Sequence, residues 1–173
     1  MIVIVNSGPL MTLGKLGMLE LLARLYGQVE LPTAVFTEVV ARGCKRGYSD
    51  AFLVQLAIQR GHLSVVEVNN AELPPDIASL PLDLGEKQTL YIALRDKADL
   101  VLFDDLKVRE EAQARGLTVK GTLGILIQGY RKGLIKLLEV EAIVNTIIAR
   151  GDIWISEELC RKVLSRLKTI SQK

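Results

Sequence analysis

Short apolar runs alternate with helical patterns along the first two thirds of the chain. Strands are predicted at 2–5, 29–32, 63–68 and 100–103, with a further short one at 117–119. The run at 100–103 is too short and too uniformly apolar for an amphipathic helix, which is typical of a strand buried on both faces of a parallel sheet. Because helical patterns follow most strands, the order predicts an α/β fold. A central, mostly parallel sheet of four to five strands would carry helices on both faces, in three α/β/α layers.

Apolar residues at helical spacing mark the segments between and after these strands. Helices are predicted over 19–26, 33–42, 50–60, 80–98 and 105–115, from Thr122 onward, and twice within 139–171. The helix over 50–60 is expected to bury one face, made of Phe52, Leu53, Leu56 and Ala57. The segment 41–50 is interpreted as a basic, glycine-rich connection, and 69–81, with three prolines, as a loop.

The length of the chain and the absence of a linker limit the number of domains that it can form. No internal repeat or linker interrupts the 173 residues, which are enough for one domain with a core of its own. We therefore expect a single domain over 1–173, with the helices of 139–171 as an appended helical part.

Composition and charge narrow the class of protein. A charged fraction of 24% with 49% hydrophobic residues indicates a globular chain, and a net charge of +2 neither requires nor excludes nucleic acid. Cys44 and Cys160 have no CxxC spacing, which argues against a zinc site or thioredoxin-like chemistry. No apolar run has the length of a bilayer span or a signal peptide. We expect a cytoplasmic location and no membrane partner.

Polar side chains follow two predicted strands directly. Asn6 follows 2–5, and Asp104 and Asp105 follow 100–103. Ligands bind at the carboxyl edge of open α/β sheets, so two adjacent like charges there require a cation or a structural explanation. Asp105 is equally explained as a cap for the next helix that pairs with Arg109, and Asn6 as a turn residue. One cap suffices for one helix, so Asp104 lacks that explanation.

Glu38 is predicted to point inward from its helix. It lies four residues after Ala34 and three after Val35, on the buried side, where a lone carboxylate is costly unless something pairs with it.

Glu86 is predicted on the inward face of another helix, four residues before Leu90 and in the first turn, where the helix macrodipole is a sufficient explanation by itself. Together with Asn6, Glu38 and Asp104 it supplies the oxygen ligands that hard divalent cations, Mg²⁺ or Mn²⁺, prefer. Such a site activates water and holds a phosphodiester for in-line attack.

Five stretches, taken in order, resemble a PIN domain. The chain is most similar to a small prokaryotic subfamily with a DTSPL-like start and a GTLG segment. The matching stretches are NSGPLMTLGKLG, LPTAVFTEVV, LDLGEKQTLYIAL, LVLFDDLKVREEAQARGL and VKGTLGILIQGYRKGLI. They extend from residue 6 to about residue 135.

The resemblance implies a metal-dependent ribonuclease fold, often found as the VapC-like toxin of a toxin and antitoxin pair and commonly a homodimer. Carried over by position, the metal ligands fall on Asn6, Glu38, Glu86 and Asp104, with Asp105 as an adjacent catalytic contributor. PIN domains usually have aspartate where this chain has Asn6, and the amide removes one negative charge from the site. Thr122 resembles a small hydroxyl residue near PIN active sites, and it equally suits a helix N-cap.

Basic residues are the candidates for RNA contacts. Arg42, Lys45 and Arg46 lie in the 41–50 segment, and Lys107 and Lys120 lie near predicted strand ends. Thr122 is a further, uncharged candidate for substrate binding. A solvated charged surface explains the same cluster of cations.

Two functions from different classes follow. The first is a Mg²⁺- or Mn²⁺-dependent endoribonuclease that hydrolyses RNA with a metal-activated water, as the toxin partner of an antitoxin protein. The second, motivated by Asn6, is a weak or inactive PIN-like binding module for a protein or RNA. A receiver domain would need an acidic pair after the first strand, and dinucleotide binding would need a G-x-G-x-x-G spacing; this chain has neither.

Overall fold

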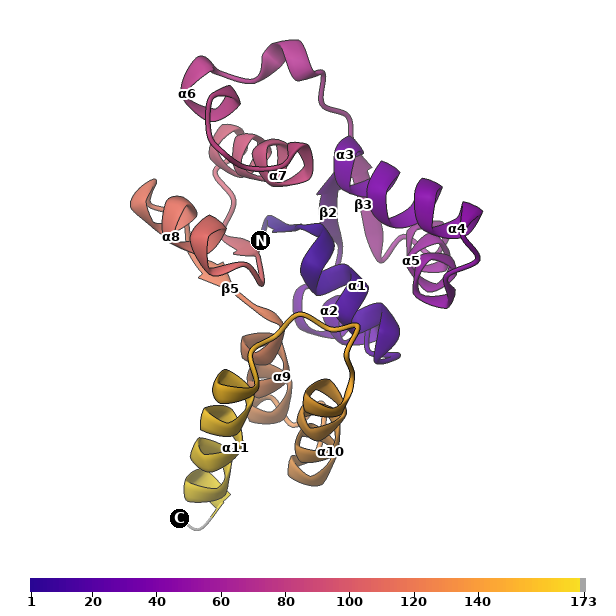
Figure 1. Cartoon of the computed structure of the whole chain (residues 1–173), viewed down its shortest axis with the longest axis vertical. Helices are drawn as coiled ribbons and strands as arrows, with labels where there is room; N and C mark the ends of the chain where they lie inside the picture. The colour runs from indigo at the N-terminus through magenta and orange to yellow at the C-terminus, as the bar shows by residue number, and fades with distance from the viewer. Residues whose placement is uncertain (172–173) are drawn as a thin grey trace. The chain divides into compact units, whose positions relative to one another are not determined.

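A five-stranded parallel sheet forms the centre of the fold (Figure 1). The computed structural model describes residues 1–171, and its strands lie in the order β3-β2-β1-β4-β5. They are β1 (Val3–Val5), β2 (Val29–Pro32), β3 (Leu63–Val66), β4 (Leu100–Leu102) and β5 (Val119–Lys120). Ile4 of β1 pairs with Glu30 on one side and with Val101 on the other. The predicted α/β fold with a parallel sheet of four to five strands is confirmed.

Helices connect the strands and make up the last third of the chain. They are α1 (Ser7–Lys15), α2 (Glu20–Tyr26), α3 (Thr33–Phe36), the π-helical η1 (Thr37–Arg42), α4 (Gly43–Lys45), α5 (Ser49–Gln59), the 3₁₀ turn η2 (Asn70–Glu72), α6 (Pro75–Ala78), α7 (Leu84–Arg95), α8 (Leu106–Ala114), α9 (Thr122–Arg131), α10 (Leu137–Ala149) and α11 (Glu157–Ser171). Gly27 and Gly116 have φ of +77° and +82°, which lets the chain leave α2 and α8 through the left-handed region.

The two faces of the sheet are covered by different helices. Right-handed crossovers place α1, α2 and α5 on one face and α7 and α8 on the other. Because side chains alternate along a strand, Ile4, Val101 and Phe103 all point toward α7 and α8, where they join a buried cluster with Leu90 and Val108. This cluster fixes α7 and α8 on the sheet by burying apolar surface.

The strand order reverses between β1 and β4. The chain runs outward from β1 through β2 to β3, then returns through α7 to β4 on the other side of β1. In an open parallel sheet this switch point forms a crevice outside the carboxyl ends of the strands, where ligands bind. Asn6 follows β1 and Asp104 follows β4 after one residue, so both lie at this edge.

Two segments are more helical than predicted. The helix that begins at Thr33 continues through η1 and α4 to Lys45, so the predicted connection over 41–50 is mostly wrong. The predicted loop over 69–81 contains η2 and α6.

The predicted buried face of α5 is wrong except for Ala57. Ala57 is buried as expected, but Phe52, Leu53 and Leu56 are exposed, while Ala51 and Val54 are buried. The helix carries apolar residues on several sides, so its spacing does not select the face that meets α1 and β3.

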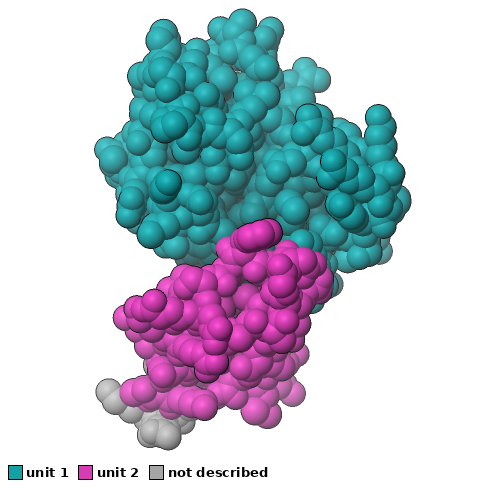
Figure 2. Space-filling model, viewed as in Figure 1, with its two compact units in different colours: residues 1–122 teal, residues 123–173 magenta. Residues whose placement is uncertain are grey.

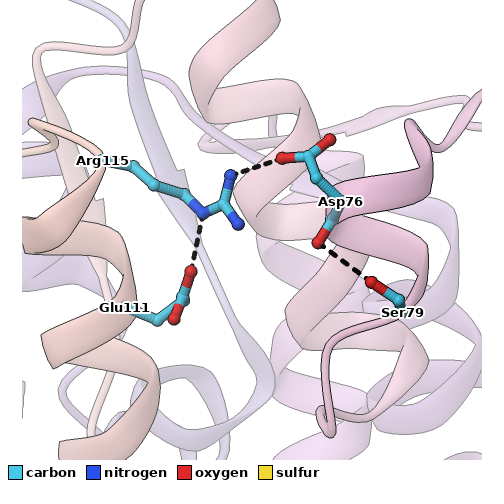
Figure 3. Close-up of polar contacts among 4 residues, drawn as sticks. All are labelled: Asp76, Ser79, Glu111 and Arg115. Atoms are coloured by element: carbon cyan, nitrogen blue, oxygen red, sulfur yellow. Dashed lines mark hydrogen bonds and ion pairs between the residues drawn. The ribbon is translucent and has the colours of Figure 1, made fainter.

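Arg115 links α8 to α6 (Figure 3). Its guanidinium lies 2.6 Å from Asp76 Oδ2 and 2.8 Å from Glu111 Oε1. The hydrogen bond from Arg115 lowers the pKa of Asp76, whose main-chain carbonyl also accepts a hydrogen bond from the Ser79 hydroxyl. These contacts connect the segment before α7 to α8.

The chain divides into two compact units, residues 1–122 and 123–173 (Figure 2). The first contains the whole sheet. In the second, α10 contacts α11, and Val144, Ile147, Cys160 and Leu167 are buried. The single domain over 1–173 with an appended part over 139–171 stays a prediction.

Among residues 1–171, no helix combines the length and the apolar character that crossing a membrane requires.

We predict that Phe103→Ala lowers the free energy of unfolding by about 3–5 kcal/mol, because it leaves a cavity in the cluster beneath α7 and α8. Leu106→Ala, at a residue that is 65% exposed nearby on α8, should change it by less than about 0.5 kcal/mol. Urea unfolding of both variants measures the difference, and equal effects would contradict the assigned core.

Candidate active site

Asp104 is held in one orientation at the switch point. The Thr122 main-chain N–H donates to its Oδ1 and the Thr122 hydroxyl donates to its Oδ2, both at 2.7 Å. Burial raises the pKa of Asp104, while the two hydrogen bonds from Thr122 and the charge of Arg109 act in the opposite direction. Burial therefore disfavours the charged form of Asp104, and the two hydrogen bonds from Thr122 fix the orientation of its carboxylate.

Two glycines allow the backbone to approach Asp104. A Cβ atom at Gly121 would lie 3.0 Å from Asp104 Oδ1, and one at Gly8 would lie 3.4 Å from Asp104 Cβ. A side chain at position 121 would displace the carboxylate, so the GT of the GTLG segment packs directly on it.

Arg109 carries the positive charge that acts to lower the pKa of Asp104. Its Nη1 lies 3.6 Å from where a Gly121 Cβ would be, and its Nε is buried without a hydrogen-bond partner among the described residues. The predicted ion pair between Arg109 and Asp105 is not present among residues 1–171. The charge of Arg109 instead acts to lower the pKa of Asp104.

Glu38 lies at the rim of a cavity and not in the core. It is exposed, so its predicted inward orientation is wrong, and Val39 and Val40 are the buried residues of η1. A π-helical turn has more residues per turn than an α-helix, so the spacing that aligned Glu38 with Ala34 does not hold there. The Ser7 hydroxyl, at the start of α1, donates a hydrogen bond to Glu38 Oε2.

Glu86 is half-buried in the first turn of α7, as predicted. It forms a capping box in which its main-chain N–H donates to Asp83 Oδ1 at 2.8 Å and its Oε2 accepts from the Asp83 N–H at 3.0 Å. Burial raises the pKa of Glu86, and the charges of Asp83, Asp105 and Glu38 raise it further. Several carboxylates are thus close enough to repel one another.

Asn6 is buried and contacts α7. Its Oδ1 accepts a hydrogen bond from the Thr89 hydroxyl at 3.3 Å and lies 3.5 Å from where a Gly85 Cβ would be. The glycine before Glu86 therefore lets the start of α7 approach the end of β1.

Asp105 serves as the N-cap of α8. Its Oδ1 accepts from the Val108 N–H at 3.1 Å, which is the structural explanation offered by the sequence. The side chain is exposed, and its charge still acts on Glu86.

The basic candidates lie in different places. Arg42, at the end of η1, lines the same cavity as Glu38, whereas Lys45, Arg46 and Lys107 are exposed and do not line it. Thr122 is fully buried and donates both of its hydrogen bonds to Asp104. An RNA contact by any of these residues stays a prediction.

The donor set suits a hard divalent cation in its chemistry. Carboxylate oxygens of Glu38, Glu86 and Asp104 and the amide oxygen of Asn6 are the ligand types that Mg²⁺ and Mn²⁺ prefer. A cation would relieve the repulsion that raises the pKa of Glu86. As the side chains stand in residues 1–171, no three acidic, histidine or cysteine side chains form a closed ligand group.

Some residues that support the site were not predicted. Ser7 and Thr89 act on Glu38 and Asn6 through the tertiary structure, and no sequence spacing identifies them. The D-x-x-E spacing of Asp83 and Glu86 is a capping-box signal that could have been identified.

Comparison with known proteins gives a family and a fold. A family model described as a PIN domain matches residues 2–169. The chain is similar to a PilT N-terminus domain protein from the hyperthermophilic archaeon Sulfolobus solfataricus P2, with 15% identity and a TM-score of 0.53 over 74% of this chain and 92% of that one. It is also similar to a domain of a functionally unknown protein from Methanocaldococcus jannaschii DSM 2661, with 17% identity and a TM-score of 0.45 over 69% and 89%. No curated protein matches this chain.

We predict that Thr122→Val lowers the free energy of unfolding by about 1–3 kcal/mol and raises the pKa of Asp104, because it removes a donor to a partly buried carboxylate. Thr122→Ser retains the hydroxyl and should keep the pKa of Asp104 near that of the unaltered chain. Carbon-detected NMR titration of the Asp104 carboxyl group measures this pKa, and equal values in both variants would contradict the assigned role of the hydroxyl.

Proposed function

This chain belongs to the PIN-domain family, and from that premise we propose that it is a Mg²⁺- or Mn²⁺-dependent endoribonuclease. The PIN domain is a nuclease-type fold, and PIN domains generally use divalent metals. The observation that supports the proposal most is the group of acids around half-buried Glu86, whose pKa is raised first by burial and further by the charges of Asp83, Asp105 and Glu38.

The proposed ligands are Glu38, Glu86 and Asp104, with Asn6 as a neutral oxygen donor. A bound divalent cation would lower the pKa of a coordinated water and offset charge on the phosphate in the transition state. Asp104 is held in place by Thr122, and the Ser7 hydroxyl orients Glu38. Such fixed oxygens reduce the reorganisation that binding requires.

Further roles rest on the resemblance to VapC-like proteins. They are a toxin activity, an antitoxin protein as partner, a homodimer and a cytoplasmic location, and all four stay predictions.

A second candidate function is a PIN-like binding module that does not cleave. Asn6 favours it, because an amide at the end of β1 leaves the site one charge short, and its Oδ1 already accepts a hydrogen bond from Thr89.

We predict that Asp104→Asn reduces metal-dependent cleavage of a mixed single-stranded RNA pool at least about 100-fold. The amide can keep both contacts with Thr122, so the fold should be retained. The exposed α8 residue Glu110 provides the control, since Glu110→Gln should cleave normally. Full cleavage by Asp104→Asn would contradict the proposed site. No cleavage by the folded unaltered chain with either metal would favour the binding module.

The same variant has an expected pH signature. Since the pKa of Asp104 is raised in the fold, its ionisation lowers stability as pH rises above the unfolded value of about 3.9. Asp104→Asn should therefore be at least as stable as the unaltered chain at pH 7 without metal. The difference should disappear below about pH 3. Thermal unfolding at both pH values measures it.

We predict that Asn6→Asp tightens Mn²⁺ binding by about tenfold, because it adds a charge while keeping the oxygen that accepts from Thr89. Titration calorimetry measures the affinity. Asn145→Asp on α10, far along the sequence and exposed, tests whether added net charge alone has this effect. An unchanged affinity in Asn6→Asp would remove this position from the metal site.

A further inference from the structure

A cavity of about 520 Å³ opens beside Glu38. It lies between the α3–η1 segment and the start of α7, and residues 68–70 close its far side. This volume falls within the range of small-molecule sites, about 300–1,000 Å³. The cavity adjoins the proposed active site, because Glu38 and Asp83 belong to both.

The lining combines apolar walls with exposed donors that are available to a ligand. Ala34, Val68 and Leu84 supply apolar surface. Asn69 and Asn70 use their Oδ1 atoms to accept from the Ala71 N–H and from Gln88 Nε2. Their Nδ2 groups donate no hydrogen bond to the described residues.

Arg42 adds a positive charge at the same cavity. Its guanidinium forms no hydrogen bond or ion pair within residues 1–171, although Glu38 lines the cavity with it. The groups available to a ligand are thus two amide donors, one guanidinium and apolar walls. This combination suits a flat ring with acceptor atoms that is joined to an anion.

Gln88 makes the cavity rigid. Its Oε1 accepts from the Ala34 N–H and its Nε2 donates to Asn70 Oδ1, both at 2.8 Å. The side chain is buried and joins three walls of the cavity, which are α3, α7 and η2. The Asn70 amide is therefore positioned before any ligand arrives.

We propose that this cavity binds one unstacked nucleotide of the RNA, next to the phosphodiester bond that is cleaved. The base lies between the apolar walls and accepts hydrogen bonds from the Nδ2 groups of Asn69 and Asn70, and Arg42 contacts a phosphate. The identity of the ligand as RNA rests on the proposed function. An extruded base implies a single-stranded substrate, because bases in a duplex are stacked and paired.

The test uses the full chain without metal and the four nucleoside 5′-monophosphates as probes. NMR spectra should show shifts of the Asn69 and Asn70 side-chain NH₂ signals that saturate at millimolar nucleotide. Asn69→Asp and Asn70→Asp keep the Oδ1 atoms that bind Ala71 and Gln88 but lose the donors, so each should weaken binding about tenfold. Asn145→Asp serves as the matched control and should bind normally.

Arg42→Gln should also weaken binding, whereas Arg60→Gln, at the exposed end of α5 and outside the cavity, should not. Equal losses in both would indicate general attraction to positive charge and would overturn the site. Absence of saturable shifts would overturn it as well, even if the chain cleaves RNA. Saturable binding by a chain that does not cleave RNA would support the cavity and contradict the nuclease.

Discussion

A costly carboxylate at the point where the strand order reverses is the constraint around which the site is organised. Asp104 is placed there by β4, and burial opposes its charge. The fold compensates with two hydrogen bonds from Thr122, the charge of Arg109 and two glycines that let the backbone close around it. An apolar side chain in place of Asp104 would need none of these compensating contacts. The presence of a carboxylate there therefore indicates a function.

The other candidate ligands depend on links between helices. Ser7 at the start of α1 holds Glu38 of η1, and Thr89 of α7 holds Asn6 at the end of β1. Gln88, one residue before Thr89, fixes the wall of the adjoining cavity. The first half of α7 therefore positions both the acids and the cavity, and a shift of this helix would alter the two together.

The sequence predicted strand positions well, but it gave the wrong orientation for Glu38 and the wrong face for most of α5. Strands such as 29–32 are short apolar runs bounded by turn residues, so local pattern is sufficient to locate them. The exposed position of Glu38 depends on a π-helical turn, and the buried face of α5 depends on which neighbours it meets. Neither is encoded in residue spacing, because a helix with apolar residues on several sides has more than one face that it can bury.

The amino-acid sequence was sufficient to predict the parallel α/β fold, the similarity to PIN domains and the polar residues at the ends of β1 and β4. Apolar periodicity and the order of motifs can be read directly along the chain. Only the tertiary structure decided which polar groups compensate each acid, because Thr122, Ser7 and Thr89 lie 18, 31 and 83 residues from their partners. It also decided the cavity beside Glu38. Such contacts form only when helices and strands distant in the sequence pack together, so local sequence patterns do not predict them.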